Sequence, residues 1–344
     1  MFNEQLSHDI MKKEDICSMT ASELEAFAET LGEESYRGGQ IFQWLHKRGA
    51  IRFSDMTNLP ADFRQKLAEA AEIRFLTPIK RIAAKDSEKL LFKTADGFFA
   101  ESVRINRGYG AAVCVSSQSG CKMGCRFCAS AKSGLSANLT AGEIAAQVYA
   151  FERVSTVIVM GMGEPFDNYG ATTRFLDVIN DKRGMGLGAR HVTVSTCGLT
   201  DKIIEFAENR SQTNLAVSLH APNDGVRRMI MPVAARYPMN RLLDACKRYS
   251  IMTGRRVTYE YVLIKDLNDG NEHARELALK LRGSLCHVNI LKLNDAGNDY
   301  KPSDKNVEKR FVSVLERYGV PVTIRKSAGA DINAACGQLR AAKL

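Results

Sequence analysis

The spacing of apolar positions changes twice along the chain, and each change marks a different kind of predicted structure. Over roughly the first 75 residues, apolar side chains recur three or four positions apart, as on one face of an α-helix. Helices are predicted in TASELEAFAETLGEE, which opens with the capping-box pattern Thr20-x-x-Glu23, in RGGQIFQWLHKRG, and in the segment that begins at Pro60. Residues 1–75 are therefore predicted to form a helical accessory domain.

Residues 76–106 follow another pattern, in which polar and apolar positions alternate. This alternation predicts antiparallel strands, separated by polar turns at Lys85–Lys89 and at residues 95–97. We expect the segment to be a short β-strand linker between the helical domain and the rest of the chain.

From residue 107 to residue 344, short apolar strands alternate with amphipathic helical segments, one of which opens with a second capping box, Thr140-x-x-Glu143. This order predicts an α/β domain with a parallel sheet, whose active site is expected at the carboxyl ends of the strands. The six predicted strands are residues 111–116, 156–161, 191–196, 214–219, 256–264 and 286–291, and a further apolar stretch is 321–325.

Composition agrees with a globular protein, because 45% of the 344 residues are hydrophobic and 25% are charged. No apolar run approaches the ~18 residues of a membrane span, and the N-terminus lacks the apolar stretch of a secretory signal. We expect a cytoplasmic protein that does not bind membranes.

The net charge is +9, which suits a polyanionic partner but does not by itself identify one. Basic residues also lie on the predicted helices of the first domain, where they could hold phosphate groups. Equally, this domain could have a packing role only, and the sequence leaves both interpretations open. The basic residues are Arg37, Lys47, Arg48, Arg64 and Lys66.

The nine cysteines are an odd number scattered over a long chain, which argues against a framework of structural disulfides. Cys246 and Cys286 occur in apolar patterns and are predicted to be inert core thiols. Cys121, Cys125 and Cys128 differ, because they share the eight-residue segment CKMGCRFC directly after the first strand of the α/β domain.

The spacing C-x₃-C-x₂-C offers three soft thiolate ligands and no fourth. A structural zinc site normally has four ligands and would have to recruit Cys114, which the predicted strand holds seven positions upstream. An iron–sulfur cluster bound by three cysteines keeps one iron free for another ligand, which favours radical chemistry with S-adenosylmethionine (SAM). The cluster interpretation is preferred, and zinc remains the alternative.

Several further segments, together with the cysteine motif, resemble the RlmN/Cfr family of radical SAM RNA methyltransferases. They are YRGGQIFQWLHKRG, CVSSQSGCKMGCRFCAS, MGMGEPFDN, VTVSTCG, VSLHAPND, LIKDLND and DINAACGQL. The resemblance extends over nearly the whole chain and is strongest to the dual-specificity branch that methylates adenine C2. It implies a partial (β/α)6 radical SAM barrel that follows the helical accessory domain and the β linker.

Through this resemblance, Cys121, Cys125 and Cys128 correspond to the ligands of a [4Fe-4S] cluster. Cys336 corresponds to the family's methyl-carrying cysteine, Cys114 to the cysteine that resolves the intermediate, and Glu101 to a proposed general base. The positions that correspond to SAM contacts are Gly163, Glu164, Ser195, Ser218, Leu219, His220 and Asn294.

The family's chemistry implies two SAM molecules per turnover, one to methylate Cys336 and one to generate a radical at its methyl group. The implied product is an adenine methylated at C2 in 23S rRNA and in tRNA, with a flavodoxin or ferredoxin as reductant, and we expect a monomer. The sequence departs from the family at Asp295 and Ala296, where proline is common, and at Ala328, where arginine is common.

Three other functions are weighed against this one. A Cfr-like enzyme would methylate adenine C8 and shares the same cysteines. A radical SAM enzyme for a small molecule or peptide would not need the Cys114/Cys336 pair or the helical domain. A non-catalytic metal-binding RNA protein would hold zinc or a cluster without cleaving SAM.

Overall fold

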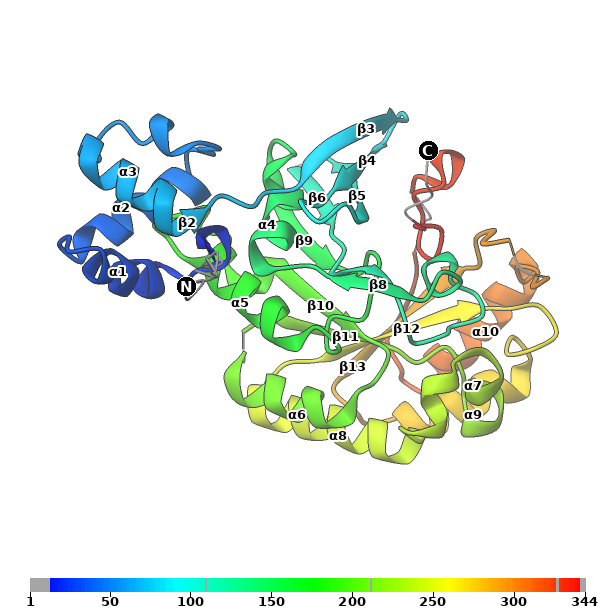
Figure 1. Ribbon diagram of the computed structural model, residues 1–344. Coiled ribbons are helices and arrows are strands. Elements are labelled where there is room, and N and C mark those ends of the chain that lie inside the picture. Colours follow the sequence, from blue (N-terminus) through cyan, green and yellow to red (C-terminus); the bar gives the residue numbers. More distant parts are fainter. Residues whose placement is uncertain (1–12, 109, 211, 298, 326–327, 341–344) are drawn as a thin grey trace, which may run out of the picture.

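The computed structural model describes residues 13–108, 110–210, 212–297, 299–325 and 328–340. The chain begins with a helical accessory domain, built from α1 (Ala21–Thr30), α2 (Tyr36–His46) and α3 (Ala61–Ala70). A short parallel pair, β1 (Glu14–Asp15) with β2 (Ala71–Glu72), joins the two ends of this domain. Figure 1 shows it at one side of the α/β domain, next to α4 and α5.

The predicted capping boxes form at both sites. Thr20 accepts the backbone N–H of Glu23, whose carboxylate accepts the N–H of Thr20, and the same reciprocal bonds join Thr140 and Glu143. These bonds satisfy N–H groups that have no partner within the helix. They explain why α1 and α4 begin where the sequence predicts.

The main sheet has ten strands in the order β14-β13-β12-β11-β10-β9-β6-β5-β4-β3. Strands β3 to β6 are antiparallel to one another, and β6 and the strands from β9 to β14 are parallel. The bounds are β3 (Thr77–Ala83), β4 (Ser87–Lys93), β5 (Phe99–Arg107), β6 (Gly110–Cys114), β9 (Val154–Val159), β10 (Val192–Thr196), β11 (Asn214–Ser218), β12 (Val257–Leu263), β13 (Cys286–Lys292) and β14 (Val322–Arg325).

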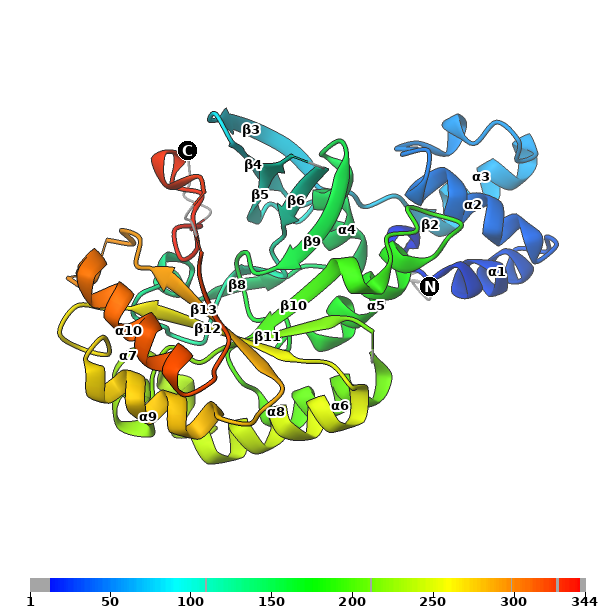
Figure 2. The same cartoon turned by 180° about the vertical axis from the view of Figure 1, so that it is seen from behind.

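Helices cover the outer face of the parallel strands, as both views show (Figures 1 and 2). They are α4 (Ala141–Tyr149), α5 (Tyr169–Asn180), α6 (Thr200–Asn209), α7 (Asp224–Ile230), α8 (Met239–Thr253), α9 (Asn271–Leu281) and α10 (Lys305–Arg317). Side chains alternate across each strand, so that Val113 and Val115 join the large core beneath the helices, whereas Cys114 belongs to a small cluster on the opposite face.

This architecture confirms the predicted α/β class and the partial barrel, and it refines three expectations. The stretch 321–325 contributes β14, a seventh parallel strand. The strands β3, β4 and β5 of the expected linker do not form a sheet of their own, because they continue the main sheet beyond β6. The turn predicted at Lys85–Lys89 is shorter than expected, because the bend covers only Lys85 and Asp86, β4 starts at Ser87, and Lys89 pairs with Val103 of β5. The strand begins with three polar residues, Ser87, Glu88 and Lys89, and such a polar run is also typical of a turn.

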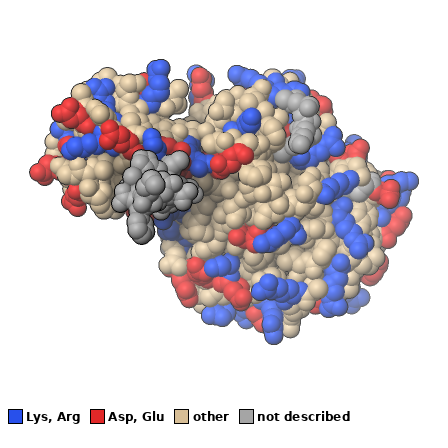
Figure 3. All heavy atoms as spheres, in the orientation of Figure 1, with Lys and Arg blue, Asp and Glu red and all other residues tan. Residues whose placement is uncertain are grey.

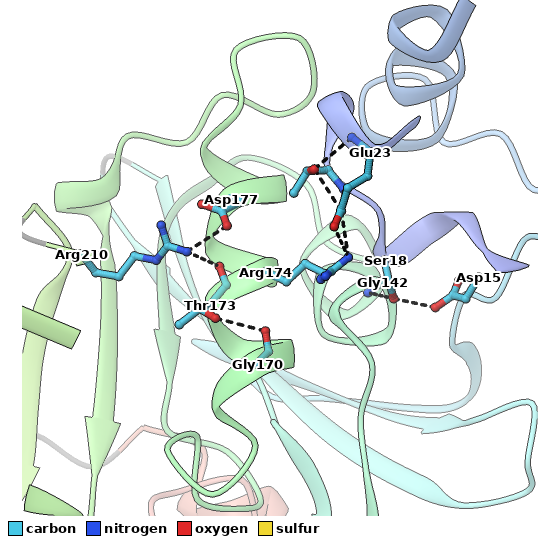
Figure 4. A network of polar contacts seen from close by, with 10 residues as sticks. Asp15, Ser18, Glu23, Gly142, Gly170, Thr173, Arg174, Asp177 and Arg210 are labelled. Atoms are coloured by element: carbon cyan, nitrogen blue, oxygen red, sulfur yellow. Dashed lines mark hydrogen bonds and ion pairs between the residues drawn. The ribbon is translucent and has the colours of Figure 1, made fainter. Parts of the chain in front are cut away.

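The accessory domain packs against α4 and α5 through polar contacts that Figure 4 shows. Arg174 of α5 pairs with Glu23 of α1 at 2.7 Å, and the backbone N–H of Gly142 in α4 donates to Ser18 Oγ at 3.0 Å. Apolar residues of both parts also belong to one continuous core. The two parts are therefore joined by a packed interface and not only by the chain.

Among the residues that the structure describes, no helix combines the length and the apolarity needed to cross a bilayer. Acidic and basic side chains are interspersed on the face drawn in Figure 3, over both the accessory domain and the barrel.

Candidate active site

A cavity of about 940 Å³ lies at the carboxyl ends of the parallel strands. Its wall combines residues from the strand ends, from the cysteine loop and from the chain's last described segment, residues 328–340. Strand ends of a parallel sheet meet at one edge, which is why residues far apart in sequence converge here.

The cysteine loop is held by a small antiparallel pair, β7 (Gln118–Gly120) with β8 (Leu135–Asn138). Gly120 has φ of +77°, and a Cβ at this position would lie 2.0 Å from the carbonyl oxygen of Gly134. Only glycine fits such a close approach in this conformation. The N–H of Cys121 then donates to that same carbonyl at 2.8 Å, which fixes the start of the loop.

Cys121, Cys125 and Cys128 all line the cavity. Burial raises the pKa of Cys121 to about 12, and burial together with the charges of Cys128 and Cys121 raises the pKa of Cys125. The thiols are thus close enough to repel one another once ionised, and a cationic centre is needed to hold all three as thiolates. Three clustered soft donors of this kind fit an iron–sulfur cluster.

The described residues contain no group of three His, Cys, Asp or Glu side chains that converge on a single metal ion. A four-ligand zinc site is therefore not formed in this part of the chain. Cluster ligands bind different irons and need not converge on one point.

Six of the seven positions that the sequence assigned to SAM lie in the cavity wall: Gly163, Glu164, Ser195, Ser218, His220 and Asn294. Leu219 does not. Its side chain is fully buried in the core, and its carbonyl accepts a hydrogen bond from Nε of the buried Arg227. Leu219 therefore only links Ser218 and His220, the two neighbouring residues that do line the cavity.

Glu164 is buried, with one carboxylate oxygen accepting the N–H of Phe166 at 3.0 Å and the other that of Cys197 at 2.7 Å. Burial raises the pKa of this carboxyl, and the bond from Cys197 opposes the rise. Two backbone donors therefore fix the orientation of Glu164 between the ends of β9 and β10.

His220 is buried, and its Nδ1 accepts the backbone N–H of Val262 at 3.0 Å. Burial lowers the pKa of His220 to about 3, so the ring is neutral with its proton on Nε2. The ring packs edge-on against Phe127, at 4.8 Å between centroids. A neutral imidazole thus connects the end of β11 with the cysteine loop.

The structure brings Cys336 and Cys114 together, although 222 positions separate them (336 − 114). Both line the cavity, and the pKa of Cys114 is raised to about 12 by burial and then by the charge of Cys336. Cys336 is exposed, and the surface that it presents lines the cavity. Asn294 Nδ2 donates to the carbonyl of Cys336 at 3.1 Å, so this amide holds the thiol-bearing residue.

Glu101 lies outside the wall of the cavity but close to it. It is buried and forms an ion pair with Lys89 at 3.1 Å, and its second oxygen accepts the backbone N–H of Arg340 at 2.9 Å. The family resemblance suggested a general base at this position but gave no indication of its contacts with Lys89 and Arg340.

Two residues of the cavity wall were missed by sequence reasoning. Glu260 of β12 is buried and lies 3.5 Å from Arg325 of β14, and its Oε2 has no hydrogen-bond partner among the residues that the structure describes. A carboxylate within the apolar strand VTYEYVL and an arginine within VTIR were available signals. Both strands were assigned by their apolar residues alone.

Comparison with known proteins supports a radical SAM assignment. Residues 115–278 match the family model of the radical SAM superfamily, and residues 14–73 match the model of the ribosomal RNA large subunit methyltransferase N-terminal domain. The chain is 47% identical to a probable dual-specificity RNA methyltransferase RlmN of Pelotomaculum thermopropionicum, over 95% of this chain and 91% of that protein. It is 42% identical to the RlmN of Clostridium novyi, over 95% of this chain and 97% of that one.

A solved structure, a radical SAM methyltransferase from Sphaerobacter thermophilus, is similar over 96% of this chain and 100% of that one. The two share 43% of their residues and a TM-score of 0.91. The similarity is therefore too extensive to be confined to the barrel and includes the accessory domain.

Proposed function

This chain belongs to the RlmN family of radical SAM RNA methyltransferases, and from that premise we propose that it methylates carbon 2 of a specific adenine in 23S rRNA and in tRNA. The observation that carries the proposal is the convergence of Cys336 and Cys114 on one cavity with the three loop cysteines. A radical SAM enzyme without a covalent carrier would not need this second thiol pair.

In the proposal, Cys121, Cys125 and Cys128 hold a [4Fe-4S] cluster, and the residues at the strand ends hold SAM. Buried Glu164 presents a carboxylate for the SAM ammonium group, and Ser195, Ser218 and Asn294 offer hydrogen bonds to its other polar atoms. When bound, the cluster and SAM would supply a radical able to remove a hydrogen atom from the methyl group carried by Cys336.

Cys336 first accepts that methyl group from another SAM molecule, so two are used per turnover. Covalent catalysis of this kind divides a difficult transfer into easier steps, because adenine C2 is too electron-poor to accept a methyl cation. The methylene carbon on Cys336 would then bond to C2, the resulting adduct would give up one electron to the bound cluster, and Glu101 would accept the proton that C2 loses. The Cys114 thiolate then attacks the sulfur of Cys336, the bond between that sulfur and the methylene carbon breaks, and the carbon takes up a proton to become the methyl group of the released RNA. A thiol reductant reduces the Cys114–Cys336 disulfide.

The target adenine must leave its stack to reach the cavity, as bases do in sequence-specific RNA recognition. The accessory domain is proposed to hold the surrounding phosphates. A flavodoxin or ferredoxin is the proposed reductant, acting on a monomer.

The test compares Cys336→Ala with the native enzyme after anaerobic cluster assembly. We expect the variant to show a brown chromophore and reductant-dependent 5′-deoxyadenosine, and to lose RNA methylation. Cys286→Ala, at a core thiol outside the cavity wall, is the matched control and should retain both activities. Methylated RNA from Cys336→Ala at the native rate would refute the carrier role.

Mass spectrometry of the RNA product decides the position on the base. We expect 2-methyladenosine, and 8-methyladenosine would instead indicate the Cfr-like alternative. Bound zinc without a chromophore would support the non-catalytic alternative.

A further inference from the structure

The segment that carries Cys336 folds over the cavity and is held to the cysteine loop, to the loop after β13 and to the β4–β5 hairpin. In Figures 1 and 2 it rises, in red, beside the ends of β3 and β4, away from the outer helices. Its path includes left-handed backbone at Gly329 and Asn333, with φ of +73° and +50°. Only a few residues of this segment form regular structure, so contacts with neighbouring segments must define its position.

One side is fixed to the cysteine loop. The N–H of Ala129 donates to the carbonyl of Gly337 at 2.7 Å, and Ser130 Oγ donates to the carbonyl of Leu339 at 2.5 Å. These partners follow Cys128 directly, so the order of this side depends on the same loop that is proposed to hold the cluster.

The opposite side is fixed by two charged residues. Lys89 Nζ donates to the carbonyl of Asn333 at 3.1 Å, and Glu101 accepts the N–H of Arg340 at 2.9 Å. Asn333 precedes Cys336 and Arg340 follows it, so the two bonds lie on either side of the reactive cysteine. Lys89 and Glu101 are themselves paired at 3.1 Å and are mostly buried.

The register of the sheet explains why these two side chains meet. Lys89 pairs with Val103 and Glu101 pairs with Leu91, which places Lys89 and Glu101 diagonally on one face of the β4–β5 hairpin. Val103 also pairs with Cys114 and belongs to the same apolar cluster, together with Leu339 of the tail. The face that carries the charged pair is thus the face that carries Cys114.

We propose that Lys89 and Glu101 form a charged clasp that holds residues 333–340 so that Cys336 stays beside Cys114, which makes Lys89 a positioning residue. This inference rests on the proposed function, which makes Cys336 the methyl carrier and Cys114 the thiol that attacks it. A buried ion pair is weak as a source of stability, but removal of one partner leaves the other charge without compensation. A role in positioning suits such a pair better than a role in stability.

The clasp also gives the proton transfer a structural consequence. When Glu101 takes the proton from the adenine carbon, the carboxyl becomes neutral and its charge no longer pairs with Lys89. The bonds of Lys89 to Asn333 and of Arg340 to Glu101 then lack the ion pair that orients them, at the stage when Cys114 must reach the sulfur of Cys336 and the RNA must leave.

The test measures amide hydrogen exchange by mass spectrometry on the cluster-loaded enzyme, in peptides that cover residues 328–340. Loss of one hydrogen bond from a charged donor predicts about tenfold faster exchange of this segment in Lys89→Met. Lys89→Arg keeps the charge and should restore exchange to within about twofold of the native rate. Methylation should follow, with kcat lowered in Lys89→Met and KM for RNA unchanged.

Lys93→Met is the matched control, because Lys93 is an exposed lysine on the same strand. It should leave both exchange and methylation unchanged. Native exchange of the tail in Lys89→Met would overturn the clasp.

If Lys89→Met also unfolds β4 and β5, seen as faster exchange there, Glu101→Gln provides the second measurement. Its amide oxygen can still accept the N–H of Arg340, but it carries no charge. We expect faster exchange confined to the tail, whereas a role as base alone predicts lost methylation with native exchange and would overturn the clasp. Methylation by Cys336→Ala would refute the proposed function and leave these exchange results in force.

Discussion

Three buried glutamates belong to the candidate site and the chain around it, and their partners give them three different properties. Glu164 is oriented by two backbone N–H donors, and Glu101 is paired with Lys89. Glu260 lies beside Arg325, and one of its oxygens has no hydrogen-bond partner in the described part of the chain. Burial raises the pKa of both Glu164 and Glu260. Residue type alone therefore does not assign a role, because a glutamate can be oriented by backbone donors, can form an ion pair that holds another segment, or can lie beside an arginine with one oxygen not hydrogen-bonded.

A buried histidine gives a prediction about pH and stability. His46 of α2 lies at the interface with the barrel, its Nδ1 is 3.0 Å from the hydroxyl of Tyr149, and burial lowers the pKa of His46 to about 4. In the unfolded chain His46 takes up a proton near pH 6.5, whereas in the folded chain it does so only near pH 4. The stability of the fold is therefore retained above pH 6.5 and falls as the pH drops toward 4.

The expected loss in the free energy of unfolding is roughly 3 kcal/mol between pH 6.5 and 4. Urea unfolding of the native chain and of His46→Phe over this range measures it, because the difference between the two isolates this histidine. Parallel curves would contradict the burial of a neutral ring at this position.

At the scale of elements, the helix starts were predictable because a capping box is a local signal within four residues. The approach of α4 to the accessory domain was not predictable in this way. A Cβ at Gly142, the second residue of α4, would lie 2.6 Å from Cβ of Cys17 and 2.9 Å from its carbonyl oxygen. This glycine therefore permits the close contact that Figure 4 shows between the two parts.

Gly142→Ala should weaken this contact by about 1–3 kcal/mol, since overpacking forces backbone shifts. Thermal unfolding and limited proteolysis of the accessory domain measure the effect. Gly170→Ala in α5 is the control, because a Cβ there meets nothing within 4 Å and alanine should be neutral or slightly stabilising. Equal melting temperatures for the two variants would show that the contact is looser than described.

At the scale of the whole molecule, the accessory domain shares a core with the barrel. Deletion of residues 1–75 would therefore expose apolar surface of α4 and α5, and loss of activity after deletion would not distinguish RNA binding from stability. Charge substitutions on the surface make a sharper test, because Lys47 and Arg48 are exposed beyond the end of α2.

The double change Lys47→Glu with Arg48→Glu should lower RNA affinity and reduce the slope of log affinity against log salt by about 1 to 2. Cleavage of SAM in the absence of RNA should be unchanged. Lys247→Glu with Arg248→Glu, an exposed pair of the same types on α8, should leave RNA binding close to native. Equal losses from both pairs would argue for general electrostatics and against a specific role of the accessory domain.

The sequence by itself determined what depends on near neighbours: the helix starts at Thr20 and Thr140, the period of the strands, and the spacing of the three loop cysteines. Resemblance to a family added Cys336 and Cys114 as a pair. Only the tertiary structure decided that Lys89 belongs to a strand and pairs with Glu101, and that these two residues bond Asn333 and Arg340 on either side of Cys336. It also decided that Glu260 lies beside Arg325. These contacts depend on sheet register and on the return of the tail across the cavity. No local window of sequence encodes such distances, because the partners come together only when the whole sheet is built.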